Sequence, residues 1–216
     1  HHGFAIAVQI RDAMAVRIEI ETEPVSGGRV VLHLLFRLLP MLVMAGVLTA
    51  AATIVAFAIG ISVVATGHVP WRLASFQVRA IRQRVRTFSG FFLLRADTPP
   101  WPAELDLCDP GDDPRVTVTV DVPTTLVRWA PLSHTARAVA HLLLLVPLAV
   151  ALDLLYPVWL VLVARRGWST TAKERLVVTE QWTADVLAHA WPVSATPPRP
   201  RWAELTSARR STGSNR

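Results

Sequence analysis

The chain is poor in cysteine and in charged residues. Its single cysteine, Cys108, cannot form a disulfide within the chain, which excludes a disulfide scaffold. Charged residues make up 18% of the 216 residues and hydrophobic residues 52%, whereas an average soluble protein has roughly 25% charged residues. This balance excludes a disordered chain. The mixed, partly polar N-terminal stretch also predicts that no cleavable signal peptide is present.

The short motifs of common enzymes are missing as well. The chain has no Gly-x-Ser-x-Gly nucleophile elbow, no glycine-rich phosphate loop and no His-Glu-x-x-His zinc motif. The sequence therefore predicts a protein that is not an enzyme and that holds no cofactor and no metal.

Negative charge is absent from a long stretch of a chain whose net charge is +6. No carboxylate occurs between Glu23 and Asp97, and arginines follow the apolar run inside that stretch. Basic residues beside an apolar run are typical of the cytoplasmic rim of a membrane, where anionic lipids attract them. We therefore expect the anionic inner leaflet of the lipid bilayer as a partner. Nucleic acid is not expected, because no helix-turn-helix, zinc-module or RNP-type motif is visible.

Two long apolar runs dominate the chain. Residues 38–64 contain no charged residue, and residues 138–164 contain only Asp153. A straight helix of either length would measure about 40 Å, against roughly 30 Å of bilayer hydrocarbon. Both runs are therefore predicted to be membrane segments.

An internal duplication with a period of about 100 residues is the most informative feature of the sequence. Residues 16–21 and 116–121 both alternate apolar and polar side chains, as a half-buried strand does, and Thr-Pro-Pro recurs at residues 98–100 and 196–198. We assign four segments: repeat unit 1 (residues 1–105), an acidic linker (106–115), repeat unit 2 (116–206) and a disordered tail (207–216).

Each repeat unit is expected to contain strands, a membrane segment and a helix. In unit 1 these are strands at 4–10 and 16–20 that could pair, membrane segment 30–64 and helix 71–92; in unit 2 they are strand 116–122, membrane segment 138–164 and helix 172–190. Helix 71–92 has apolar side chains on one face and arginines on the rest, which is typical of a helix lying in the membrane interface. The predicted fold class is a membrane α-helical protein with short β-strands, built by internal duplication of a strand–membrane hairpin–interfacial helix unit.

The charges on both sides of each run favour a hairpin over a single crossing. A hairpin enters and leaves on the cytoplasmic side, with turns near Gly46 and residues 151–153, whereas single crossings would place the two strand regions on opposite sides of the membrane. We therefore expect a multi-pass protein of the cell (inner) membrane with cytoplasmic termini. The residues expected at the membrane interface are Trp71, Arg72, Arg79, Arg82, Arg84, Arg86, Arg165, Arg166 and Trp168.

Several landmarks together resemble the bacterial integral membrane protein family known as domain of unknown function 4389, in two tandem copies. In the first copy these are Ile-Glu-Thr-Glu-Pro at 20–24, Leu-Leu-Pro at 38–40, Gly-His-Val-Pro-Trp at 67–71, Phe-Phe-Leu-Leu at 91–94 and Asp-Thr-Pro-Pro at 97–100. The second copy matches at Asp-Val-Pro (121–123), Arg-Trp (128–129) and Val-Pro (146–147), but its last helix carries Glu174, Glu180 and Asp185. The resemblance implies an integral membrane protein with a cytoplasmic strand region, no established enzymatic activity and no catalytic residue to carry over.

Histidines and intramembrane charges are the candidates for chemistry. His134 and His141 would share a helix face, and His33 holds a comparable place in unit 1, so the three could ligate haem or a metal, or they could simply pack near helix starts. Asp153 could line a proton or ion path with Arg37 or His33 as its counter-charge, or it could be solvent-exposed in the hairpin turn.

Four carboxylates of the acidic linker surround Pro-Gly at 110–111: Asp106, Asp109, Asp112 and Asp113. They could bind Ca²⁺, but the EF-hand order is absent, so a solvated linker is the favoured interpretation.

Three functions stay open on the sequence alone. The first is a non-enzymatic accessory or scaffold subunit of a membrane complex, with a protein partner or as a homo-oligomer. The second is a small transporter or channel component that uses Asp153 and Arg37. The third is a haem-bearing redox subunit.

Overall fold

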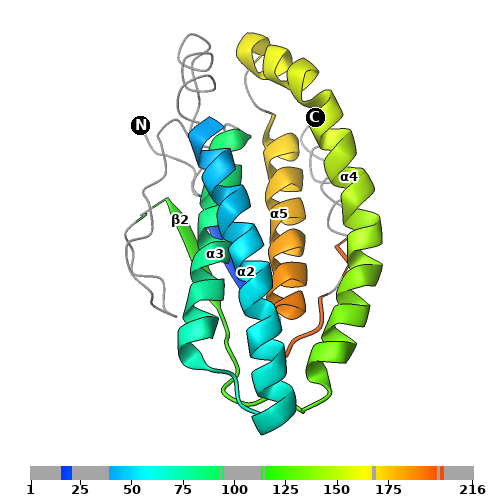
Figure 1. The fold of residues 1–216 in the computed structure, drawn as a ribbon. Coiled ribbons are helices and arrows are strands. Elements are labelled where there is room, and N and C mark those ends of the chain that lie inside the picture. The colour runs from blue at the N-terminus through cyan, green and yellow to red at the C-terminus, as the bar shows by residue number, and fades with distance from the viewer. Residues whose placement is uncertain are drawn as a thin grey trace.

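A computed structural model describes residues 16–20, 39–92, 94, 113, 115–166, 169–198 and 200–201. Within them, the order strand, long helix, shorter helix occurs twice (Figure 1). The elements are β1 (Val16–Ile20), α2 (Leu39–Thr66), α3 (Trp71–Phe91), β2 (Val116–Val120), α4 (Ala130–Arg166) and α5 (Thr170–Ala190).

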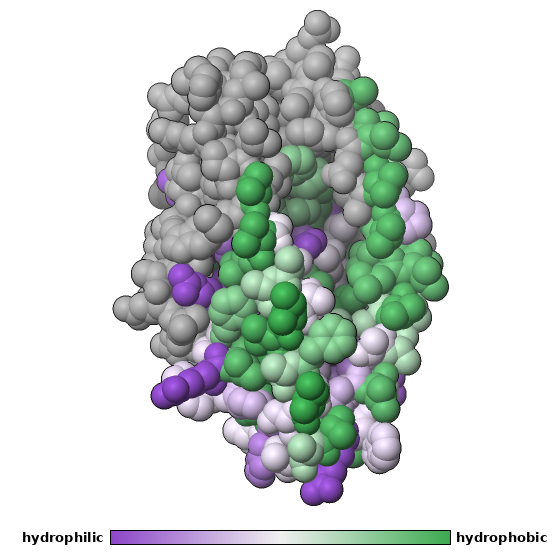
Figure 2. Space-filling view, in the orientation of Figure 1, coloured by the Kyte–Doolittle hydropathy of each residue, from purple (hydrophilic) through white to green (hydrophobic). Residues whose placement is uncertain are grey.

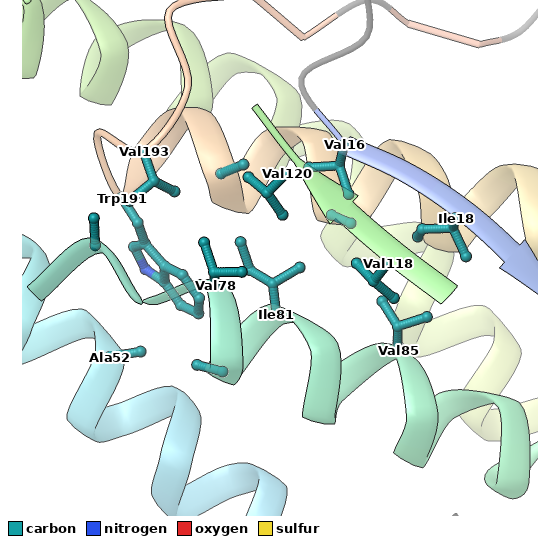
Figure 3. Packing of buried hydrophobic residues seen from close by; sticks show 14 of the residues in the cluster. Val16, Ile18, Ala52, Val78, Ile81, Val85, Val118, Val120, Trp191 and Val193 are labelled. Atoms are coloured by element: carbon teal, nitrogen blue, oxygen red, sulfur yellow. The ribbon is translucent and has the colours of Figure 1, made fainter. Parts of the chain in front are cut away.

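β1 and β2 form an antiparallel two-stranded sheet. Val16 lies opposite Val120, and Ile18 lies opposite Val118. Because successive side chains of a strand point to opposite faces, the valines and isoleucines share one face and are buried, as the alternation in the sequence predicts. In Figure 3 this face lies over α3, where Ile81 and Val85 point toward it. Residues 16–20 therefore pair with the strand of the second unit. The expected pairing with residues 4–10 lies outside the described residues.

The two units exchange their shorter helices across the sheet. α3 packs beside α2 of its own unit but also on β2, and α5 packs beside α4 but also on β1. In Figure 1, α5 lies between the long helices α2 and α4, whereas α3 passes behind α2 and emerges on its other side. Each strand is therefore covered by a helix from the other unit, so neither unit can complete its core alone.

The predicted membrane hairpins are wrong. Each apolar run is one continuous helix of 28 residues in α2 and 37 residues in α4, and each antiparallel return is made by the next, more polar helix, α3 or α5. A glycine within a helix costs only about 1 kcal/mol, so Gly46 does not end α2. Helix α4 likewise continues through residues 151–153. Because α3 and α5 return toward the sheet, the two strands meet although each long helix runs outward only once.

The expectation of a multi-pass membrane protein is wrong for the same reason, and the predicted fold class and location are corrected with it. Among the described residues, one helix is long and apolar enough to cross a membrane, over Ala45–Thr66 in α2, with a mean hydropathy of 2.4. The chain is a small helical protein with a two-stranded sheet. α4 instead packs one side on α5, where Ala138 and Leu145 are buried against Trp182.

The turn between α2 and α3 ties the two units together. Gly67 has a φ of 76°, a left-handed conformation that favours glycine. Its carbonyl oxygen accepts a hydrogen bond from the Leu126 N–H at 2.9 Å, and the Val69 N–H donates to the Thr124 carbonyl at 3.1 Å. The end of the first helical pair is therefore joined to the segment that leads into α4.

Candidate functional site

A cleft lies between the two long helices and is the candidate site. It has a volume of about 920 Å³ and is lined by residues of α2, α3, α4 and α5. Figure 2 shows it as a hollow flanked by hydrophobic surface, with a hydrophilic spot inside. Small residues of α2 leave this space open: Ala45, Gly46, Thr49, Ala50 and Thr53.

The walls of the cleft are mostly apolar. Leu142, Leu145 and Val146 of α4 face it, as do Phe88 and Phe91 of α3. The threonine hydroxyls of α2 donate to carbonyls four residues earlier in their own helix, Thr49 to Ala45 at 2.7 Å and Thr53 to Thr49 at 2.9 Å. Their donors are thus already used, and such a lining suits a hydrocarbon chain better than a polar molecule.

One ion pair supplies the charge in the cleft. Arg84 Nε of α3 lies 3.5 Å from Glu180 Oε1 of α5, and the side chains are 34% and 1% exposed. Neither of these two atoms makes a hydrogen bond of good geometry within the described part of the chain. Burial raises the pKa of Glu180, while the neighbouring Arg84 opposes that rise. Arg84 is therefore the charged group that the cleft presents to a ligand.

Side chains of α5 satisfy the outer edge of β1. Gln181 Oε1 accepts from the Ile18 N–H at 2.9 Å, and its amide nitrogen donates to the Val16 carbonyl. Asp185 accepts from the Val16 N–H at 3.2 Å and from Arg201 at 3.1 Å. Burial raises the pKa of Asp185 to about 6, although Arg201 favours its ionised form. These contacts protect a strand edge that would otherwise expose unpaired backbone groups.

Two of the arginines predicted for the membrane interface, Arg82 and Arg86, are instead buried, and Arg82 bonds to the other edge of the sheet. Arg82 is 1% exposed and donates through Nε to the Val118 carbonyl of β2 at 3.3 Å. Arg86 is fully buried, with its Nε 3.7 Å from Asp113 Oδ2, and the other carboxylate oxygen, Asp113 Oδ1, accepts from the Arg115 N–H. α3 is a core helix, so the prediction of an interfacial helix is wrong. For Asp113, the interpretation as part of a solvated linker is wrong too.

The remaining predicted interface residues are scattered. Trp71 is 61% exposed, with the Arg72 guanidinium 5.9 Å from its ring centroid, and Arg79 is half-buried. Arg165 and Arg166 lie in the last turn of α4, with side chains outside the described part, where Trp168 also falls. The structure thus gathers no basic patch from the described members of this set.

The candidate histidines of α4 are engaged by α5. The His134 ring stacks on His189 with 3.8 Å between centroids, and His141 Nδ1 accepts a hydrogen bond from Trp182 Nε1 at 3.2 Å. Burial lowers the pKa of His134 and of His141. Burial, followed by the charges of His134 and Arg137, lowers the pKa of His189 to about 4. Ligation of haem or metal would have to break these packing contacts, and no cluster of three or more ligating side chains occurs among the described residues.

Several predicted residues lie outside the described residues: His33, Arg37, Asp106, Cys108, Asp109 and Asp112. Asp153 lies within α4, so the interpretation that places it in a hairpin turn is wrong, and its side chain is among those not described.

From the sequence alone, no role is assigned to Glu180, which lines the cleft, to Gln181, which bonds to β1, or to His189, which stacks on His134. A signal existed for the first, because the last helix of unit 2 departs from unit 1 by carrying carboxylates where helix 71–92 carries arginines.

Comparison of the chain with protein-family models, with curated proteins and with solved structures finds no match. Membership of the family named above therefore stays a prediction.

Proposed function

We propose that this protein is a non-enzymatic, membrane-associated accessory or scaffold subunit that enters the bilayer through α2. The observation that carries the proposal is the exposure of large apolar side chains on that helix. Ile54 is 73% exposed, Phe57 74% and Ile61 71%. Only 17% of the most apolar window of α2 is buried inside the protein, so this helix is not an ordinary core helix.

An exposed apolar surface of this extent is expected to contact lipid or another protein rather than water. Soluble monomers rarely expose contiguous apolar patches larger than a few hundred Å², and larger ones mark membrane or protein contacts. Residues 38–64 carry no charge, and α2 can satisfy its backbone groups internally, which is what hydrocarbon demands of a spanning segment. We therefore assign lipid as the surroundings of the exposed face of α2.

Helix α4 supplies the surface for a protein partner. Leu143 is 71% exposed and Leu154 76% exposed, on a helix whose other side packs against α5. In Figure 2 this surface lies beside that of α2. A membrane-embedded helix of a partner subunit, which is apolar all round, fits such a surface.

The experiment for α2 is co-flotation of the full chain with liposomes. Ile54→Arg should lower the membrane–water partition coefficient about 100-fold, because an arginine within a spanning helix costs roughly 3 kcal/mol. Val127→Arg is the matched control, since Val127 is 75% exposed but lies outside α2, and it should float normally. Equal flotation of both variants would contradict the proposal.

The experiment for α4 is mild detergent extraction. A partner subunit should copurify in fixed stoichiometry, and Leu143→Arg should release it while leaving liposome binding intact. A chain that always purifies alone would contradict the scaffold role. The transport and haem hypotheses stay predictions, because Asp153 and Arg37 have no described side-chain contacts and the described histidines are used in packing.

A further inference from the structure

We propose that the cleft between α2 and α4 binds a single long-chain fatty acid, with its carboxylate on Arg84 and its alkyl chain along the walls. The inference rests on the proposed function, because the bilayer would deliver the ligand. Membrane anchoring through α2 does not by itself need a cleft, and the inference gives this cleft a class of ligand.

The size and lining of the cleft fit one alkyl chain. A volume of about 920 Å³ lies within the roughly 300–1,000 Å³ of small-molecule pockets, which are typically apolar with a few fixed polar groups. The aromatic rings of Phe88 and Phe91 and the leucines of α4 supply the apolar wall. The absence of large side chains from the α2 wall keeps the space open, and a Cβ added at Gly46 would meet nothing within 4 Å.

The charge in the cleft selects the headgroup. Arg84 and Glu180 are the charged lining residues among those described, and Glu180 is 1% exposed whereas Arg84 is 34% exposed. A guanidinium carries five N–H donors, and the Nε of Arg84 lies 3.5 Å from Glu180 Oε1. The Arg84 side chain is 34% exposed, so its guanidinium stays accessible from the cleft and can bind a carboxylate bidentately. A cationic headgroup would meet Arg84 before it could reach Glu180.

The cleft opens where such a ligand would be found. Figure 2 shows the hollow bordered on both sides by the hydrophobic surfaces of α2 and α4. A fatty acid dissolved in the bilayer could therefore enter sideways, keeping its chain in apolar surroundings throughout.

The test uses the full chain in phosphatidylcholine nanodiscs and a palmitate that carries a photoreactive diazirine in mid-chain. We expect the label on the cleft walls, at residues 45–53 and 142–146, and competition by palmitate but not by hexadecanol. Ala50→Leu narrows the cleft and should reduce labelling roughly tenfold, whereas Ala58→Leu makes the same change on an exposed position of α2 outside the cleft and should leave labelling unchanged.

A second variant separates headgroup recognition from folding. Arg84→Met combined with Glu180→Met replaces the pair by side chains of similar length, a change that buried ion pairs often tolerate. Labelling should then persist, while the advantage of palmitate over hexadecanol should fall roughly tenfold, the value of one charge-assisted hydrogen bond.

Four outcomes would overturn the inference. Label spread evenly over α2 and insensitive to Ala50→Leu would show non-specific lipid contact. If hexadecanol competed as strongly as palmitate, Arg84 would have no role in recognising the carboxylate. Stronger competition by hexadecyl phosphate than by palmitate would assign the cleft to a phosphate headgroup. A chain that enters nanodiscs but does not label refutes only the cleft, whereas a chain that does not enter them refutes the membrane role.

Discussion

Asp185 and His189 lie one turn apart on α5, and their titrations should oppose each other. Burial raises the pKa of Asp185 from 3.8 to about 6 and lowers that of His189 from 6.5 to about 4. The contribution of Asp185 to the free energy of unfolding is complete below pH 3.8 and is lost as the pH rises through about 6. That of His189 is complete above pH 6.5 and is lost as the pH falls through about 4.

Each difference in pKa corresponds to about 3 kcal/mol, so the two contributions nearly cancel between pH 4 and 6.5. A variant that lacks one of the two titrating groups should therefore show the pH dependence of the other group. Relative to the wild type, the stability of Asp185→Asn should rise by about 3 kcal/mol between pH 4 and pH 7, and that of His189→Phe should fall by a similar amount. The hydrogen bonds that Asn loses toward Arg201 add an offset that does not change with pH.

The assay is urea unfolding in a non-ionic detergent at pH 4, 5, 6 and 7, followed by fluorescence of the buried Trp182 and Trp191. Phenylalanine at 189 keeps an aromatic ring against His134, which retains its own titration in both the wild type and this variant. If both variants follow the wild-type pH profile in parallel, the reasoning from burial is wrong.

Three further substitutions test the fold, each by the free energy of unfolding in the same assay. Ile81→Ala should cost about 2–5 kcal/mol, because Ile81 is fully buried under the sheet; a cost below 1 kcal/mol would contradict this packing. Gly67→Ala should cost about 1–2 kcal/mol, because its φ of 76° strains any other L-residue, and an unchanged stability would disprove that turn. Arg86→Met should cost about 3–5 kcal/mol by leaving Asp113 buried without this partner, and adding Asp113→Leu should recover most of it; no recovery would refute the pairing.

Local patterns in the sequence carry much of the secondary structure. Alternation predicts both strands, and the predicted helices 71–92 and 172–190 agree closely with Trp71–Phe91 and Thr170–Ala190. Strands and helices depend on the conformational preferences and the apolar periodicity of residues that are close in the sequence, and both can be read from a single sequence.

The direction that each helix faces could not be predicted in the same way. The arginines of α3 resemble those of a surface helix, and their burial depends on Asp113 and Glu180, which are distant in the sequence. The flanking charges suggested hairpins because the positive-inside rule assumes charges that face lipid or water, whereas Arg82 bonds to the sheet and Arg86 pairs with the buried Asp113. The cleft depends on the spacing between α2 and α4, which no local pattern encodes.

The depth of α2 in a bilayer tests the central claim most directly. A nitroxide spin label at Phe57, introduced as Phe57→Cys after Cys108→Ala in the full chain, reports by electron paramagnetic resonance whether lipid-soluble oxygen or a water-soluble nickel complex collides with it. We predict frequent collisions with oxygen and few with nickel at this site, and the reverse at a label on exposed Val127. Collisions with nickel at Phe57 as frequent as at Val127 would contradict the account.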